Sequence, residues 1–175
     1  MSSNVKFKSL NDVIFITASL IYRGFREKPK KNLKITHAIL HGFAFLFTIY
    51  GVNVAFNYHG SSSPHLQSLH SWIGISAVVI FALQYVVGFA CFLLPIVNQS
   101  RRAFVLPLHI FFGLFGFVLA IIACLLGVAK KGEDTFLKNA VGVSLIIYGA
   151  LVVFLVAIPN FKRQPLPEES ALLPQ

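Results

Sequence analysis

Apolar residues fall into four long runs along the chain, and short polar stretches separate them. The runs cover about residues 35–56, 69–95, 104–129 and 140–159, and each contains 20 or more residues. A helix needs about 20 mainly apolar residues to cross the roughly 30 Å hydrocarbon core of a bilayer. The pattern therefore predicts an all-α membrane protein with four full transmembrane helices.

A fifth apolar segment, residues 11–22, is too short to cross the membrane. Its 12 residues rise about 18 Å as an α-helix, well below the thickness of the hydrocarbon core. A basic run over residues 23–34 follows it, and no small-residue cleavage site does, so the segment is not a signal peptide. We expect a short N-terminal helix here, preceded by a polar stretch over residues 1–9.

The charge of the chain is consistent with a membrane protein. Only 12% of the residues are charged, where a soluble domain carries about a quarter, and 56% are hydrophobic. The net charge of +9 would suit a nucleic-acid partner, but the Lys and Arg residues cluster at the ends of the apolar runs. We therefore expect membrane lipid, and no nucleic acid, as the partner of this surface.

The distribution of Lys and Arg also predicts the orientation. Residues 23–34, the loop 96–103 and the tail from residue 160 carry Lys and Arg, whereas the loop 57–68 contains neither. The loop 130–139 is mixed, with three Lys against one Glu and one Asp. The positive-inside rule places the basic segments in the cytoplasm, and the loops 57–68 and 130–139 on the other side. The glycosylation sequon at Asn98 would then be cytoplasmic and stay unmodified.

Four histidines lie near the ends of these runs: His37, His41, His70 and His109. An ionisable ring at membrane depth is costly, so it marks a candidate functional site. Neutral imidazole is a common axial ligand of heme iron. In the predicted orientation His37, His41 and His109 share the cytoplasmic side, and His70 lies on the other. Interfacial side chains bound to lipid headgroups, and a zinc or copper site, remain as alternatives.

Three stretches, residues 34–41 (KITHAILH), 68–74 (SLHSWIG) and 102–109 (RAFVLPLH), carry a resemblance to a known family. The chain resembles the cytochrome b561 family of ascorbate-dependent transmembrane reductases over about residues 20–163. The family has six helices and two b hemes held by four histidines. We therefore expect a partial cytochrome b561 domain over residues 10–163 and a cytoplasmic tail over residues 164–175.

The resemblance assigns ligand roles to three of the histidines. His37 and His109 would bind the cytoplasmic-side heme, with His41 as their neighbour, and His70 would bind a heme on the other side. The family partner of His70 lies early on the second family helix, and residues 1–34 contain no histidine. We expect a shortened form without the first helix and most of the second, which holds one tightly bound heme b.

The resemblance also assigns residues that contact the electron donor and the electron acceptor. Lys34 lies one turn before His37, and Arg102 lies two turns before His109, so both cations would bind ascorbate at the cytoplasmic heme. His59, on the other side, would contact the acceptor, ferric iron or monodehydroascorbate. Alternatively, the two cations only anchor the helix ends at the cytoplasmic interface, and His59 is only exposed to solvent.

The expected function is electron transfer by heme b from cytoplasmic ascorbate to ferric iron or monodehydroascorbate across the membrane. The alternative is a non-catalytic fragment with one heme or none that acts as a structural or dominant-negative partner. A second copy of the chain, in a homodimer, is a separate candidate partner. In the tail, Glu168 precedes Leu172 and Leu173 as in an acidic dileucine sorting signal. This pattern favours an endosomal or lysosomal membrane, with the plasma membrane as the alternative.

Several glycines lie inside the predicted spans. Small residues there allow helices to approach closely, or leave room beside a porphyrin ring. The sequence leaves both readings open for Gly51, Gly74, Gly88, Gly113, Gly116, Gly127 and Gly142.

Overall fold

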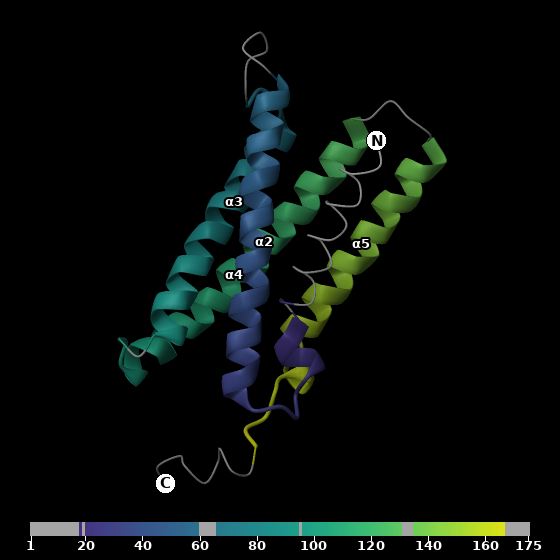
Figure 1. Cartoon of the computed structure of the whole chain (residues 1–175). Coiled ribbons are helices and arrows are strands. Elements are labelled where there is room, and N and C mark those ends of the chain that lie inside the picture. The colour runs from purple at the N-terminus through teal and green to yellow at the C-terminus, as the bar shows by residue number, and fades with distance from the viewer. Residues whose placement is uncertain (1–17, 19, 60–65, 95, 131–134, 167–175) are drawn as a thin grey trace.

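The computed structural model describes residues 18, 20–59, 66–94, 96–130 and 135–166. These residues are almost entirely helical, and no strand occurs among them. The elements are α2 (Lys30–His59), α3 (Leu69–Gly88), the π-helix η1 (Phe89–Leu93), α4 (Gln99–Lys130), α5 (Thr135–Ala157) and the 3₁₀-helix η2 (Pro159–Phe161) (Figure 1).

The prediction of four spans is confirmed. Within the described residues, four helical stretches are long and apolar enough to cross a membrane, namely α2, α3 with η1, α4 and α5. α2, α4 and α5 each begin about five residues before the apolar run that predicted them. The runs count only residues suited to the hydrocarbon core, whereas the backbone hydrogen bonds of a helix continue into the interface.

The helices pack in chain order. α2 lies on α3, α3 makes the most extensive contact with α4, and α4 lies on α5. The start of α2, the end of α3, the start of α4 and the end of α5 all lie at the lower end of the molecule in Figure 1. This end is the one whose basic segments the sequence assigns to the cytoplasm.

Two glycines let neighbouring helices approach closely. A Cβ atom on Gly116 would lie 2.9 Å from the Cγ2 atom of Ile80, where α4 meets α3. A Cβ atom on Gly149 would lie 3.5 Å from the Cγ2 atom of Ile121, where α5 meets α4. Both positions serve helix packing, the first of the two roles that small residues have in membrane helices.

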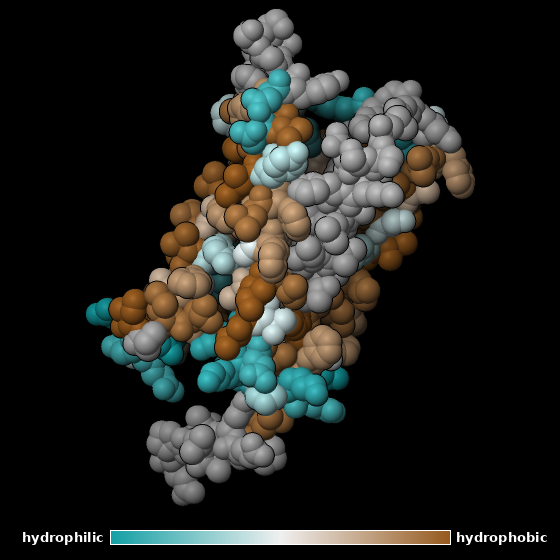
Figure 2. Space-filling view, in the orientation of Figure 1, coloured by the Kyte–Doolittle hydropathy of each residue, from teal (hydrophilic) through white to brown (hydrophobic). Residues whose placement is uncertain are grey.

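The outer surface suits a bilayer. In Figure 2 hydrophobic side chains cover the middle of the molecule, and hydrophilic side chains gather at its two ends. Large apolar side chains such as Phe104, Phe136 and Leu46 are 73%, 80% and 62% exposed, respectively. A soluble protein rarely exposes so continuous an apolar surface, whereas lipid tails cover it without cost.

A side-chain cap begins α4. The side-chain oxygen Oδ1 of Asn98 accepts a hydrogen bond from the backbone N–H of Arg101 at 3.0 Å, and Asn98 therefore caps the start of α4. The asparagine of the sequon therefore has a structural role.

Of the predicted N-terminal helix, residues 20–24 are helical, and residues 1–17 and 19 lie outside the described residues.

We expect Asn98 to remain unglycosylated in microsomes because it lies at the end that the sequence predicts to be cytoplasmic. Two variants test the orientation directly, each with the same 20-residue Gly/Ser insert containing one sequon. The insert between Ser62 and Ser63 should be glycosylated, and the same insert between Val97 and Asn98 should not. The measurement is the mass shift removed by an endoglycosidase, and the reverse pattern would contradict the assigned orientation.

Candidate functional site

Three histidines gather near the end of the bundle that the sequence predicts to be cytoplasmic. His37 and His41 lie one turn apart on α2, with ring centroids 4.4 Å apart, and His109 on α4 faces them. The ring centroids of His37 and His109 are 6.5 Å apart. The structure therefore brings together the two residues that the sequence analysis paired by depth, with His41 beside them.

A backbone carbonyl fixes the orientation of the His37 ring. The Nδ1 atom of His37 lies 2.8 Å from the carbonyl oxygen of Ala18, in the segment that precedes α2. A carbonyl oxygen can only accept, so Nδ1 carries the hydrogen, and in the neutral ring Nε2 keeps its lone pair. Histidines that bind metals usually donate their other N–H in this way. His37 is thus prepared to bind a metal through Nε2.

His109 rests on a glycine at the end of α3. A Cβ atom on Gly88 would lie 2.8 Å from the Cε1 atom of His109, closer than such contacts occur. The ring of Phe92 in η1 packs edge-on at a centroid distance of 5.3 Å. The Nδ1 atom of His109 is buried and has no hydrogen-bond partner among the described residues.

The separation of the two rings fits an iron atom between them. Two metal–nitrogen bonds of about 2 Å each and two imidazole radii of about 1 Å place the ring centroids about 6 Å apart. The observed distance of 6.5 Å is close to this value. Within the described ranges, no group of three or more His, Cys, Asp and Glu side chains is arranged to hold a metal ion. A six-coordinate heme takes two axial ligands from the protein, so this pair would suit such a heme better than a tetrahedral zinc site, which takes three or four.

Aromatic side chains continue from the histidines along the α2–α3 contact. The ring of Phe81 lies 5.6 Å from that of His41, and Phe45 lies 5.8 Å from Phe81 and stacks on Tyr85 at 5.6 Å. These rings form an apolar wall, which a porphyrin requires.

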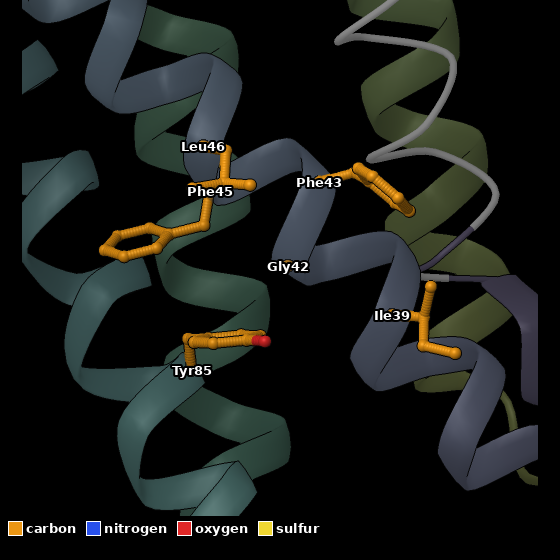
Figure 3. A pocket seen from close by; sticks show the side chains of 6 residues that line it. All are labelled: Ile39, Gly42, Phe43, Phe45, Leu46 and Tyr85. Atoms are coloured by element: carbon orange, nitrogen blue, oxygen red, sulfur yellow. The ribbon is translucent and has the colours of Figure 1, made fainter.

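An open pocket of about 330 Å³ adjoins this wall. Figure 3 shows Phe45 and Tyr85 on one side of it, and Ile39 and Phe43 directed away from them. No described histidine lines the pocket, so it lies beside the histidine pair and not between its rings. Its lining residues are Ile39, Gly42, Phe43, Phe45, Leu46 and Tyr85.

His70 lies apart from the other described histidines, at the start of α3. Its Nδ1 atom donates a hydrogen bond of 2.8 Å to the carbonyl oxygen of Ala123 on α4. A Cβ atom on Gly127 would lie 3.0 Å from the Cε1 atom of His70. The ring of His70 is therefore held as that of His37 is, by a carbonyl on Nδ1, and rests on a glycine as that of His109 does.

The predicted donor-binding cations lie at the end that the sequence predicts to be cytoplasmic. Lys34 is partly buried on α2, one turn before His37. The NH2 group of Arg102 donates to the carbonyl oxygen of Leu94 at 3.1 Å, and its Nε atom is buried with no acceptor in the described part of the chain.

His59 is the last residue of α2, and its side chain lies outside the described residues. The loop 60–65 and the sorting pattern in the tail lie outside them as well.

The sequence analysis missed the groups that support the histidines. Ala18 acts through its carbonyl oxygen, which every residue type has, and so leaves no signal in a sequence. Gly88 and Gly127 were visible as glycines in spans, but their contacts depend on which helices meet.

Tyr22, whose ring centroid lies 5.6 Å from that of His37, precedes α2. Burial raises the pKa of its hydroxyl to about 12, against a smaller opposing effect of Arg163, so Tyr22 stays neutral.

The sequence matches one protein family and is similar to several known proteins. The family model of eukaryotic cytochrome b561 matches residues 12–133. The chain is 38% identical to the transmembrane ascorbate-dependent reductase CYB561 of Mus musculus, over 89% of this chain and 67% of the relative. It is 36% identical to the lysosomal membrane ascorbate-dependent ferrireductase CYB561A3 of Mus musculus, over 91% of this chain and 72% of the relative. A third relative, the plasma membrane ascorbate-dependent reductase CYBRD1 of Xenopus tropicalis, is 35% identical over 83% of this chain and 56% of its own length.

Proposed function

The chain belongs to the eukaryotic cytochrome b561 family, and on this premise we propose that it carries electrons from cytoplasmic ascorbate through heme b. The observation that carries the proposal is the pair His37 and His109, whose ring centroids are 6.5 Å apart, with the Nδ1–H of His37 donated to Ala18. This arrangement is what axial ligation of one iron atom requires.

His37 and His109 hold the heme iron in this proposal. The family binds heme b, and the bound heme supplies the one-electron chemistry. The protein's contribution is to fix both rings and to exclude water. The carbonyl of Ala18 fixes the His37 ring, Gly88 and Phe92 fix the His109 ring, and the aromatic residues between α2 and α3 keep the site apolar.

Lys34 and Arg102 bind the ascorbate anion at the cytoplasmic edge of the heme. Arg102 is anchored by its bond to Leu94 and keeps a buried Nε–H without a protein acceptor in the described residues. Such a donor is suited to an anionic oxygen, because hydrogen bonds to charged acceptors are about twice as strong as neutral ones. Lys34 adds a second positive charge on α2.

The acceptor lies on the other side of the membrane in this proposal, at the end that carries His59 and His70. The names of the relatives include a ferrireductase and two ascorbate-dependent reductases. We propose ferric iron or monodehydroascorbate as the acceptor. The acidic dileucine pattern around Leu172 favours the lysosomal membrane, and the plasma membrane is the alternative that CYBRD1 represents.

The decisive experiment is the difference spectrum, reduced minus oxidised, of the purified full chain in detergent or nanodiscs. We expect millimolar ascorbate to produce the sharp bands of a low-spin b-type heme. A heme-free protein, or a heme that dithionite reduces and ascorbate does not, would contradict the proposed function. Either result would favour the role of a structural or dominant-negative partner.

Replacing both cations should weaken the reaction with ascorbate. Each partly desolvated cation contributes roughly 1 kcal/mol to binding an anion, so Lys34→Gln with Arg102→Gln should raise the half-maximal ascorbate concentration about thirtyfold. Glutamine at position 102 retains an N–H group for the carbonyl of Leu94.

The measurement is the initial rate of heme reduction against ascorbate concentration, with dithionite reduction as the reference for intact heme. The double variant Lys31→Gln with Arg101→Gln is the control, because both side chains are exposed and carry the same charge. Equal ascorbate kinetics in the two double variants would contradict the assigned donor site.

A further inference from the structure

Three arginines tie the segment before α2 to the end of α5. The guanidinium group of Arg23 donates to the carbonyl oxygens of Val156 at 2.7 Å and Ile158 at 3.3 Å. Arg26 donates to the carbonyl oxygen of Asn160 at 3.2 Å. In the opposite direction, Arg163 donates to the carbonyl oxygen of Lys28 at 3.0 Å and 3.2 Å. We call Arg23, Arg26 and Arg163 the arginine strap.

The strap connects parts of the chain that are about 135 residues apart in sequence. In Figure 1 residues 20–24, the purple helical segment, lie directly beside the yellow end of α5. α5 ends at Ala157, so Val156 carries one of the last carbonyls of this helix, which have no backbone donor within the helix, and Ile158 is the first residue after it. A positive charge there also interacts favourably with the helix dipole. The contact is therefore a specific one between chemically matched groups.

The same segment carries the carbonyl that supports His37. Ala18 is fully buried, and its oxygen accepts the Nδ1–H of His37 at 2.8 Å. Ile21, between Ala18 and Arg23, is only 4% exposed. Tyr22 lies one turn after Ala18, so both residues share the face that meets His37, at a ring centroid distance of 5.6 Å for Tyr22. One short helical segment thus contacts α5 through Arg23 and His37 through Ala18.

We propose that the arginine strap is a positioning device for His37. By fixing residues 20–24 on α5 it keeps the Ala18 carbonyl on Nδ1, and so presents the lone pair of Nε2 to the iron. A carbonyl on Nδ1 selects the tautomer and raises the basicity of the ligand, which stabilises the ferric state. The strap therefore sets the affinity and the midpoint potential of the heme. The part that concerns the heme rests on the proposed function.

The first test uses heme-free protein, so it is independent of the proposed function. In ¹⁵N-histidine-labelled wild-type protein, we expect the His37 resonances, identified by their loss in His37→Gln, to report a single tautomer with the hydrogen on Nδ1. In Arg23→Gln we expect a mixture of both tautomers. Arg101→Gln, which removes an exposed arginine outside the strap, should leave the single tautomer. A single Nδ1–H tautomer in Arg23→Gln would overturn the proposal.

The second test uses the heme-loaded protein. Arg23→Gln should raise the midpoint potential of the low-spin heme and lower heme affinity about 10- to 100-fold, the usual cost of losing an outer hydrogen bond to a metal ligand. Arg163→Gln should change both quantities in the same direction and by less, because it removes the other half of the strap. This second variant provides the test if Arg23→Gln does not fold. Unchanged values in Arg163→Gln, together with a misfolded Arg23→Gln, would overturn the proposal.

Arg23→Lys separates the strap from simple electrostatics. Lysine keeps the positive charge, but it cannot donate to two carbonyls as the planar guanidinium group does. We expect Arg23→Lys to behave between wild type and Arg23→Gln, and complete retention of the wild-type potential and heme affinity would contradict the need for the contact with two carbonyls. A change of tautomer in Arg23→Gln without any change of potential would support the strap and contradict His37 as the heme ligand.

Discussion

The purified chain should contain one tightly bound heme, and His37→Ala or His109→Ala should abolish its low-spin spectrum. Each of these residues would supply one ligand to the heme iron in the proposed site, and their ring centroids lie 6.5 Å apart. His70 lies at the other depth, and residues 1–34 of the sequence contain no histidine to pair with it. A heme with one axial histidine would be high-spin and weakly held.

The measurements are the heme-to-protein ratio by the pyridine hemochrome method and the low-temperature absorption spectrum. His41→Ala and His70→Ala are the matched controls, because both remove a partly buried membrane histidine. Both should keep the low-spin bands, although His41 touches the ring of His37. A ratio near two, with both hemes low-spin, would mean that another residue or a partner chain supplies the missing ligand.

We expect Gly88→Ala to displace the ring of His109 and to weaken heme binding by about 1–3 kcal/mol, or about 5- to 150-fold. The added Cβ atom would lie 2.8 Å from the Cε1 atom of His109. The backbone of Gly88 has ordinary helical angles, with φ at −61° and ψ at −43°, so alanine is compatible with the local helix. The effect would therefore come from the contact with His109 alone.

Gly113→Ala is the control for this prediction. Gly113 lies one turn after His109 on α4, and a Cβ atom there would meet only the Gln84 side chain, at an ordinary 3.9 Å. Titration of heme into heme-free protein measures the affinity of each variant, and thermal unfolding without heme measures stability. Equal heme affinity in the two variants would show that the contact with Gly88 does not position the ring of His109.

Several features of this protein were predicted from the sequence alone, because they are local. The length and composition of each apolar run determine whether it crosses a bilayer, and the four spans appeared where the runs predicted them. The depth of a histidine follows from its place in a span and the direction of that span. For this reason the proximity of His37 and His109 could be anticipated from orientation. The resemblance to the cytochrome b561 family rested on short stretches around the same histidines, and the family match agrees with it.

The tertiary structure alone decided what surrounds the histidines. Gly88 and Gly116 lie in similar apolar runs, yet one faces an imidazole ring and the other an isoleucine. The difference depends on which faces of α3 and α4 meet, and apolar side chains all around each helix leave that choice unspecified in the sequence. The Ala18 carbonyl on His37 and the Arg23 contacts with α5 are likewise hydrogen bonds between a side chain and the backbone carbonyl of another segment. Every residue offers the same carbonyl group, so only packing determines which of them meets the ligand.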